Sequence, residues 1–387
     1  PYDFFNLPPT KPTKDSLVNP GLSNTTVGRE NAITMKAAIV DAYGEIDEQL
    51  HIVEDWPEPV LDGKPFGWAL VKVLACSIAP GDWRVLSGKT RLFQRPKSFP
   101  YVAGGDVCGV VLQVQPGEKH VKLGEVVVAQ FEGTGPSRGL ADRALVWTDT
   151  CVVKPANINI AEAAALGGSA PVAMFVARHV HAGERVLVLG GAGGIGTILI
   201  QLLKLRGASF VAATSRDTQL LESLGVDRAV DYSMQDVWTM PEFKTNKFDV
   251  IIDLHEKAWT MAQRGEILKS GWNGGRFLTT VVPAGRRMKG ETYRQACCGI
   301  IVPMLSIMAK SACMPWRPRY KITGRLHSRA DLEEVCELVA AGSIKVVIDS
   351  QHPFSTQGVR AAFHKQQGHH AHGKVVVFVD DSIKKID

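Results

Sequence analysis

A glycine-rich turn between an apolar strand and an apolar helix constrains the fold of this chain more than any other feature. The short apolar run Val186–Leu189 is followed by glycines at Gly191, Gly193 and Gly196, spaced as G-x-G-x-x-G. An apolar segment with helical spacing, Ile195–Leu205, comes next. In a dinucleotide-binding βαβ unit, the first glycine permits a tight turn and the second lets the backbone approach a pyrophosphate. The third lets the helix pack closely on the strand, so the context around this motif predicts such a unit.

The same turn would bring backbone N–H groups to a bound phosphate. A helix that begins at the turn points its first N–H groups and the positive end of its dipole toward the ligand. The sequence therefore predicts a dinucleotide site formed by Gly191, Gly193, Gly194, Ile195 and Gly196. The alternative is a glycine-rich turn that binds no ligand.

The end of the next predicted strand, Phe210–Thr214, indicates which dinucleotide is bound. Sites for NAD usually have an acidic residue at this point, which accepts a hydrogen bond from the ribose 2′-hydroxyl. This chain instead has Ser215 and Arg216, a hydroxyl and a guanidinium that suit a 2′-phosphate. We therefore predict NADPH as the cofactor, with Asp217 as the N-cap of the following helix. An Arg216 that is only a solvated surface charge is the alternative.

The hydrophobic pattern changes near Glu162. Before it, residues 35–155 contain short apolar runs separated by glycine and proline, which predicts β-strands. After it, strand and helix patterns alternate, which predicts a parallel, doubly wound sheet. The predicted strands are Met35–Val40, Ala69–Ala75, Val107–Val114, Glu125–Phe131, Ala144–Val153, Arg185–Leu189, Phe210–Thr214, Phe248–Leu254, Gly275–Val282 and Lys374–Asp380, and the predicted helices are Gly194–Leu205, Asp217–Leu224 and Asp331–Ala341.

Composition disfavours several classes of protein. The 387 residues carry a net charge of +5 with no block of like charges, so no nucleic-acid partner is expected. The seven cysteines include no C-x-x-C pair, which argues against a zinc knuckle or a disulfide framework and for a reducing intracellular compartment. No apolar run reaches the roughly 18 residues of a membrane helix. Residues 1–34 resemble an extension left after organellar import, a linker or a disordered tail.

Several motifs in a fixed order support a resemblance to a known family. Besides the glycine motif they are Ala79–Arg84, Phe99–Asp106, Val121–Val126, Phe248–Asp253 and His372–Val376. From Met35 to Asp380 the chain resembles the medium-chain dehydrogenase/reductase superfamily, and more narrowly its zinc-independent quinone oxidoreductase (zeta-crystallin-like) branch. The resemblance implies an α/β fold class, a GroES-like β domain plus a Rossmann doubly wound parallel-sheet domain, in a homodimer or homotetramer. The implied division is an N-terminal extension (1–34), a GroES-like catalytic domain (35–160 and 345–387) and a Rossmann NADP-binding domain (161–344).

The resemblance also implies chemistry without zinc. Ala79, Gly105 and Gly168 match the catalytic zinc ligands of alcohol dehydrogenase members, and none of them can coordinate a metal. No cysteine lies between Cys108 and Cys151, where those members carry a structural-zinc loop. We expect no metal site in the chain. We place the histidines near its end (the late histidines) on an exposed turn and expect no metal there either. Without a metal Lewis acid, acceptors that delocalise charge are favoured, namely quinones and α,β-unsaturated carbonyls. The late histidines are His364, His369, His370 and His372.

Relatives place the segment Ala79–Arg84 close to the nicotinamide. The resemblance therefore implies catalytic roles for Arg84, as a hydrogen-bond donor to the acceptor oxygen, and for Asp82, which would orient the loop. Trp83 would form a pocket wall. The alternatives are a salt-bridged surface Arg84 and a Trp83 that belongs to the core, and Tyr101 is expected to be structural. The resemblance adds Tyr232 near the adenosine phosphate, and Thr280 and Val282 near the nicotinamide carboxamide, as cofactor-binding residues.

One departure from the relatives bears on activity. They follow the fourth Rossmann strand with Asp-Thr-Val-Gly, whereas residues 253–256 read Asp-Leu-His-Glu, so we expect Glu256 to crowd the nicotinamide. The predicted function is NADPH-dependent reduction of quinones or α,β-unsaturated carbonyls by hydride transfer without zinc. A catalytically weak or inactive NADPH-binding subunit of a larger assembly is the alternative. A third alternative is peripheral contact with a membrane through Gly299–Met308.

Overall fold

The computed structural model describes residues 33–91, 94–131, 138–255, 258–280, 305–307, 309, 313, 314, 316–323 and 328–383. By its internal contacts the chain divides into residues 1–33 and 34–387, and the second unit contains all of the helices and strands named below. Most of the predicted extension (1–34), Glu256, Val282 and most of Gly299–Met308 lie outside the described residues.

Antiparallel strands form the first part of the described chain. A three-stranded sheet has the order β2-β1-β4, and a seven-stranded sheet has the order β15-β16-β3-β5-β6-β8 with β7 paired to β3. The central strand β3 (Trp68–Ile78) is buried over most of its length, as its nearly continuous apolar sequence predicts. The remaining strands are β1 (Thr34–Val40), β2 (Leu50–Pro57), β4 (Tyr101–Val102), β5 (Val107–Val114), β6 (Val126–Ala129), β7 (Arg143–Trp147), β8 (Cys151–Val153), β15 (Ile348–Pro353) and β16 (Lys374–Phe378).

The single strand predicted over Ala144–Val153 is wrong. A 3-10 turn, η1 (Thr148–Thr150), separates β7 from β8. The hydroxyl of Thr150 donates to the carbonyl of Trp147 at 2.8 Å, and the hydroxyl of Thr148 donates to the carboxylate of Glu118 at 2.7 Å. These local hydroxyl bonds compete with the strand ladder, which explains the break.

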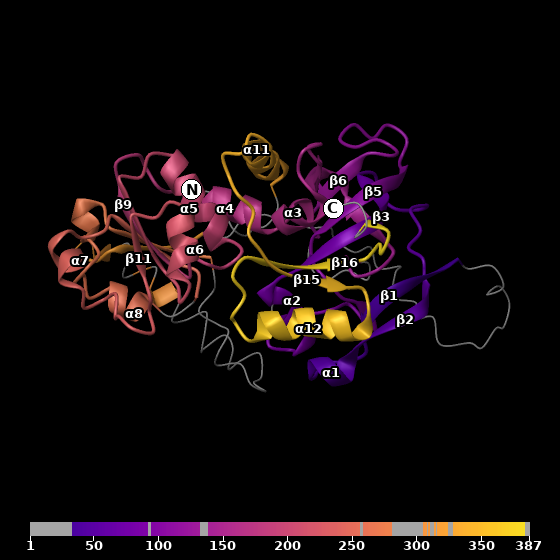
Figure 1. The fold of residues 1–387 in the computed structure, drawn as a ribbon, viewed down its shortest axis with the longest axis horizontal. Helices are drawn as coiled ribbons and strands as arrows, with labels where there is room; N and C mark the ends of the chain where they lie inside the picture. The colour runs from indigo at the N-terminus through magenta and orange to yellow at the C-terminus, as the bar shows by residue number, and fades with distance from the viewer. Residues whose placement is uncertain are drawn as a thin grey trace, which may run out of the picture. The chain divides into compact units, whose positions relative to one another are not determined.

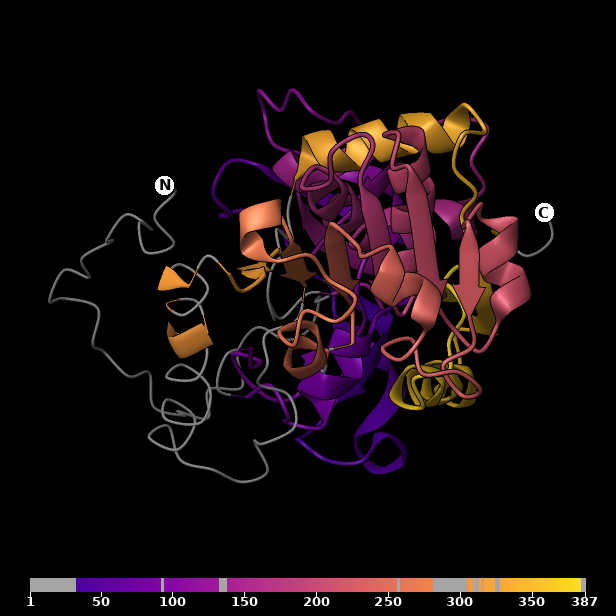
Figure 2. The ribbon, with the colours of Figure 1, turned by 90° about the vertical axis from the view of Figure 1, so that its left-hand side faces the viewer.

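The second sheet is parallel and six-stranded, with the order β11-β10-β9-β12-β13-β14. Its strands are seen side by side in Figure 2. Strand order steps outward from β9 in both directions, which is the doubly wound topology that the alternating pattern predicts. The strands are β9 (Arg185–Leu189), β10 (Phe210–Thr214), β11 (Arg228–Val230), β12 (Val250–Asp253), β13 (Arg276–Thr279) and β14 (Arg319–Ile322).

Helices connect and cover these sheets, and buried alanine, leucine and valine side chains dominate the contact between α4, α5 and β9. Among the described residues no single helix is long and apolar enough to cross a membrane, although the bent pair α3 and α4 meets the same criteria of length and composition. The helices are α1 (Ile46–Gln49), α2 (Pro80–Leu86), α3 (Ile160–Leu166), α4 (Ser169–Ala177), α5 (Gly196–Leu205), α6 (Thr218–Ser223), α7 (Pro241–Thr245), α8 (Trp259–Ala262), α11 (Arg329–Ala340) and α12 (Thr356–Gln367), with a further 3-10 turn η2 (Gly271–Asn273).

The end of the chain returns to the first part, as predicted. Strand β16 pairs antiparallel with β3 and parallel with β15, and α12 lies beside β15 and α2 (Figure 1). The turn before β16 also reaches the glycine motif, because Gly373 forms an isolated parallel bridge with Gly193. The turn between α12 and β16 is therefore placed against the predicted dinucleotide site. The boundaries at 160/161 and 344/345 stay a prediction.

Burial predicts which thiols react. Burial raises the pKa of the Cys108 and Cys336 thiols to about 12, and it also raises the pKa of the buried Cys76 and Cys151. Because the thiolate is the nucleophile, we expect iodoacetamide at pH 8 to leave these four unmodified in the native protein and to label the exposed Cys313. Peptide mapping by mass spectrometry, with the denatured chain as control, checks this; rapid native labelling of Cys76 or Cys108 would contradict it.

Candidate active site

The carboxyl ends of four parallel strands meet at one edge of the six-stranded sheet. Leu189 is in register with Thr214 of β10 and with Asp253 of β12, and Asp253 is in register with Thr279 of β13. The glycine motif follows β9, Ser215 and Arg216 follow β10, and Thr280 follows β13. Ligands of open α/β sheets bind at this edge, where the strand order reverses.

The tight turn after β9 rests on a different glycine from the one predicted. Gly190, not Gly191, has a positive φ of +87°. A Cβ atom at Gly190 would lie 2.5 Å from the ring of His255, so this position excludes a side chain for two reasons. Gly191 instead needs to be glycine for packing, because a Cβ there would lie 2.8 Å from the side chain of Ala213.

The other glycines of the motif leave space that is compatible with their predicted roles, although the contact of Gly193 with a pyrophosphate stays a prediction. A Cβ at Gly196 would lie 2.6 Å from the carbonyl oxygens of both Gly190 and Gly191, so α5 can approach the turn only without one. A Cβ at Gly193 would meet only the carbonyl oxygen of Gly190, at 3.6 Å. Gly193 therefore borders open space, as a position next to a pyrophosphate requires. Ile195 is the N-cap of α5, so this helix begins two residues later than predicted.

Lys374 borders the same turn and is a residue that the sequence patterns did not single out. Its side chain is buried and passes 2.6 Å from the position of a Cβ on Gly194. Its ammonium lies 4.0 Å from the carboxylate of Asp106, which also accepts a hydrogen bond from the Gly168 amide at 2.7 Å. Burial raises the pKa of the Asp106 carboxyl, and the Lys374 ammonium opposes that rise. The motif His372–Val376 contained the signal, because a lysine within a buried strand needs a partner or a ligand.

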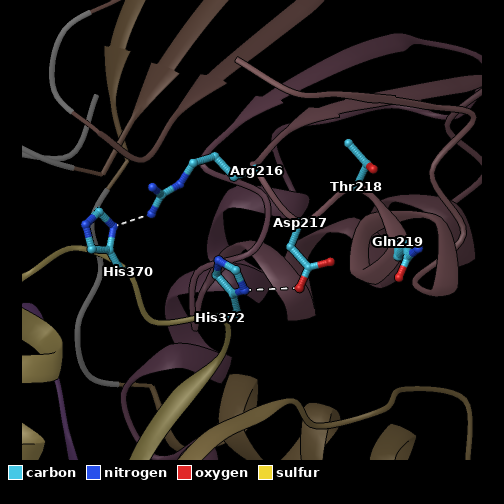
Figure 3. A pocket seen from close by; sticks show the side chains of 6 residues that line it. All are labelled: Arg216, Asp217, Thr218, Gln219, His370 and His372. Carbon is cyan, nitrogen blue, oxygen red and sulfur yellow. Dashed lines mark hydrogen bonds and ion pairs between the residues drawn. The ribbon is translucent and has the colours of Figure 1, made fainter. Parts of the chain in front are cut away.

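A pocket of about 700 Å³ opens beside the end of β10. Arg216, Asp217, Thr218 and Gln219 line it from one side, and His370 and His372 line it from the turn before β16 (Figure 3). Arg216 and His370 are in hydrogen-bond contact, and His372 lies 3.0 Å from the carboxylate of Asp217. The predicted 2′-phosphate residue Arg216 therefore lines an open surface pocket together with His370 and His372, which lie on the late turn as expected.

The other residues predicted near the cofactor differ in burial and in their hydrogen bonds. Asp217 is the N-cap of α6, as predicted, and accepts from the Leu220 amide at 2.9 Å. Ser215 is buried, and its hydroxyl oxygen accepts from the amide of Asp217 at 3.0 Å. Tyr232 follows β11 and is 53% exposed, whereas Thr280 directly follows β13 and is partly buried. Roles for Ser215, Tyr232 and Thr280 in cofactor binding stay predictions.

The segment predicted to face the substrate forms α2 and the residues beside it. Asp82 accepts from the amide of Ala79 at 2.8 Å and forms an ion pair with Arg138 at 2.9 Å. Both side chains of this pair are under 10% exposed. Asp82 thus fixes the start of α2, which is the orienting role predicted for it, and Arg138 is a partner that no sequence pattern indicated.

Trp83 and Arg84 differ in exposure. Trp83 is buried within the core of the β-rich part, beneath the Lys89 ammonium and edge-on to the ring of His369. Its indole N–H has no hydrogen-bond partner within the described residues. Arg84 is half-buried on the same helix. Tyr101 is buried in β4, and burial raises the pKa of its hydroxyl, in keeping with a structural role.

Each of the three positions that match zinc ligands lies beside a carboxylate. A Cβ at Gly105 would lie 3.2 Å from a carboxylate oxygen of Asp82, and a Cβ at Gly168 would lie 2.6 Å from one of Asp106. Ala79 is held by Asp82. None of these three positions offers a ligand atom. Within the described residues no group of three or more His, Cys, Asp or Glu side chains could hold a metal ion.

One expectation on the histidines is wrong, and the expectation on Glu256 stays a prediction. His364 is not on the late turn but within α12, where it lies 3.0 Å from the carboxylate of Asp47. Glu256 lies outside the described residues, and His255 is the residue of this segment that contacts the glycine turn. Asp253 holds the segment in place by accepting from the His255 amide at 2.8 Å and the Ala258 amide at 2.9 Å.

Comparisons with known proteins agree with this geometry. Residues 65–182 match the family model for the alcohol dehydrogenase GroES-like domain, and residues 224–377 match the model for zinc-binding dehydrogenase. The chain is 30% identical to the chloroplastic NADPH-dependent alkenal/one oxidoreductase of Arabidopsis thaliana, over 92% of this chain and 82% of that protein. It belongs to the zinc-independent, quinone oxidoreductase-like branch of the medium-chain dehydrogenase/reductases.

Other members of this branch are similar over most of the chain. The 2-methylene-furan-3-one reductase of Solanum lycopersicum is 32% identical, over 80% of this chain and 71% of its own length. The mitochondrial NAD(P)H oxidoreductase RTN4IP1 of Mus musculus is 29% identical, over 93% of this chain and 92% of its own length. Among solved structures, the Escherichia coli quinone oxidoreductase complexed with NADPH has a TM-score of 0.68 at 21% identity, covering 89% of this chain and 99% of that chain. The GroES-like plus Rossmann fold predicted for this chain is confirmed.

Proposed function

We propose that this chain reduces quinones or α,β-unsaturated carbonyl compounds with NADPH, by hydride transfer that needs no zinc. One observation carries the proposal. The glycine turn and the Arg216 pocket lie at one sheet edge, while the positions matching the family's zinc ligands are Ala79, Gly105 and Gly168, which offer no ligand atom. The named activities of the Arabidopsis and tomato relatives are of the same class.

The described residues fit NADPH. Gly193 leaves space beside the turn among the described residues, and α5 begins directly after this turn, which suits a pyrophosphate. We propose that Lys374, beside Gly194, adds a cation there, and that Arg216 binds the 2′-phosphate. Ser215, Tyr232 and Thr280 extend the proposed site. Bound NADPH would supply a hydride from its nicotinamide ring.

The residues of α2 would handle the acceptor. Asp82, fixed by Arg138, sets the position of the helix that carries Trp83 and Arg84. We propose that Arg84 donates a hydrogen bond to the acceptor oxygen as negative charge develops there, with Trp83 forming the wall below it. A conjugated acceptor spreads that charge, so hydrogen-bond donors suffice where a simple ketone would need a metal.

Turnover after metal removal tests the proposal. The purified protein, treated with a chelator, is offered NADPH with an ortho-quinone, a 2-alkenal, a long-chain enone or a simple ketone. We expect loss of NADPH absorbance with the conjugated acceptors and none with the ketone. Activity that disappears on chelation and returns with zinc would contradict the proposal.

Replacing Arg216 with glutamine should weaken NADPH binding and leave NADH binding unchanged. Hydrogen bonds to a charged group contribute about 1.5–3 kcal/mol, so we expect the dissociation constant for NADPH to rise roughly 10- to 150-fold. Arg228→Gln is the matched control, because Arg228 is also exposed but pairs with Glu242 at 3.1 Å. Fluorescence titration measures both constants; an equal loss for NADH would contradict the role in phosphate binding.

A homo-oligomer is the proposed assembly. Within the described chain β14 pairs only with β13, which leaves its other edge available. Two exposed tryptophans lie in the segments that precede β13 and β14, Trp272 at 71% and Trp316 at 58% exposure. Edges and large apolar side chains of this kind are usually covered by another chain. Light scattering of the protein as it elutes from a size-exclusion column measures the mass of the assembly. A monomer at micromolar concentration would contradict the proposal.

We also propose that the protein works in an organelle, which is supported by the chloroplastic and mitochondrial relatives. Fractionation of cells that express the full-length protein tests this. The catalytically weak subunit remains the competing function, since the His255 ring packs on the glycine turn at a segment that departs from the relatives.

A further inference from the structure

The pocket after β10 holds two histidines that come from a distant part of the sequence. His370 and His372 belong to the turn that joins α12 to β16, whereas Arg216 and Asp217 follow β10. Figure 3 shows the imidazole of His370 in front of the Arg216 guanidinium and that of His372 beside Asp217. One pocket therefore receives its charged groups from both the β-rich part and the six-stranded sheet.

The contact between Arg216 and His370 is compatible with only one form of the imidazole. A guanidinium has only N–H donors and stays charged at any pH used with proteins. The Nδ1 atom of His370 faces a guanidinium nitrogen of Arg216, so Nδ1 must be the acceptor. The imidazole form that can accept a hydrogen bond in this contact is the neutral one with its proton on Nε2.

A phosphate in this pocket would reverse that arrangement. Its oxygens are acceptors and would take the N–H groups of Arg216, which removes the donor from Nδ1 of His370. An imidazole that faces a dianion is then favoured in its charged form, in which both nitrogens donate. Phosphate binding would therefore change His370 from a neutral acceptor into a cationic donor.

We propose that His370 binds the 2′-phosphate of NADPH together with Arg216, and that this binding takes up a proton. The proposal rests on the proposed NADPH site. It adds that preference for NADPH over NADH depends on pH, because only NADPH carries the phosphate. Above about pH 6, where the 2′-phosphate is a dianion, NADPH affinity falls as pH rises, while NADH affinity stays level.

The other charged groups around the pocket agree with this direction. The carboxylate of Asp217 would repel a phosphate, and His372 lies against it at 3.0 Å. Asp231 is tied to Ser233 by two hydrogen bonds, which hold the pKa of its carboxyl low. On the side of the turn, Asp349 accepts from the His372 amide at 2.7 Å and pairs with Lys365 at 3.1 Å.

Isothermal titration calorimetry with nucleotide fragments tests the proposal without turnover. The probes are 2′,5′-ADP, which carries the 2′-phosphate, and 5′-AMP, which lacks it. Titrations at pH 7.5 in buffers of different ionisation enthalpy give the number of protons taken up. At this pH the 2′-phosphate, with a second pKa of about 6, is already a dianion, so uptake reports the protein. We expect about half a proton or more for 2′,5′-ADP, and none for 5′-AMP.

Two variants assign the uptake to one residue. His370→Asn should abolish the uptake and lower 2′,5′-ADP affinity by roughly threefold to tenfold. His364→Asn is the matched control, because His364 is also exposed and ion-paired but lies on α12 against Asp47. It should keep both the uptake and the affinity. Thermal unfolding of both variants checks that the fold is intact.

Each remaining outcome overturns a defined part of the proposal. If 2′,5′-ADP binds more tightly than 5′-AMP with no proton uptake, or with uptake that His370→Asn retains, the role of His370 is wrong and the NADPH site stands. If 2′,5′-ADP binds no more tightly than 5′-AMP at any pH from about 6.5 to 8.5, the range in which a histidine titrates, the proposed NADPH site itself is wrong.

Discussion

Replacing Gly196 with alanine is expected to lower NADPH affinity by at least about 100-fold and to destabilise the protein by about 1–3 kcal/mol. The added methyl would lie 2.6 Å from the carbonyl oxygens of Gly190 and Gly191. These are backbone atoms of the turn itself, so the turn or the start of α5 must move. A displacement of about 1 Å is enough to cost two orders of magnitude in a positioned site.

The Gly193→Ala variant is expected to weaken NADPH binding and to leave the stability of the fold almost unchanged. Its methyl would make only an ordinary contact, 3.6 Å from the Gly190 carbonyl oxygen. We therefore expect a stability change within about 0.5 kcal/mol, but a loss of NADPH affinity of roughly tenfold or more, because the methyl occupies space needed by the pyrophosphate. Differential scanning fluorimetry and NADPH titration measure the two properties. If the two variants behave alike, Gly193 and Gly196 do not have the separate roles in ligand approach and helix packing.

Replacing Arg138 with methionine is expected to lower the free energy of unfolding by about 3–5 kcal/mol. Arg138 and Asp82 form a buried ion pair, and Arg138 also donates to the Gly104 carbonyl. Removing the cation leaves the Asp82 carboxylate buried without its partner charge, which is the costly way to break such a pair. Because Asp82 also holds the start of α2, acceptor turnover should fall as well.

Urea unfolding of Arg138→Met measures the stability loss. The double variant Asp82→Leu, Arg138→Met is the control, because it removes both charges and should recover much of the stability without recovering turnover. A loss below about 1 kcal/mol in the single variant, close to that of an exposed pair, would show that Asp82 is not a buried, charge-paired carboxylate.

Local sequence patterns predicted the parts of the structure that depend on neighbours along the chain. The run Arg185–Leu189 is a strand with the predicted bounds, and so is Phe210–Thr214. Each is short, apolar and bounded by turn residues, so the pattern is unambiguous. The N-cap role of Asp217 depends on an amide three residues away and was predicted for the same reason.

Long-range contacts set the limits of that prediction. Lys374, His370 and His372 meet residues that precede them by 150 positions or more, and no local pattern records such a meeting. Arg138 and Asp82 are likewise 56 residues apart. The turn glycine was assigned to Gly191 because the motif begins there, whereas the residue with the positive φ is Gly190, one position earlier.

Transfer of label from NADPH deuterated at nicotinamide C4 tests the central claim most directly. The chelator-treated protein is incubated with the labelled cofactor and an enone, and the product is analysed by NMR. Zinc-free hydride transfer predicts deuterium on the β-carbon of the saturated ketone, with the α-hydrogen drawn from water. Unlabelled enone, recovered intact while NADPH remains bound, would contradict the claim and favour a subunit that holds the cofactor without using it.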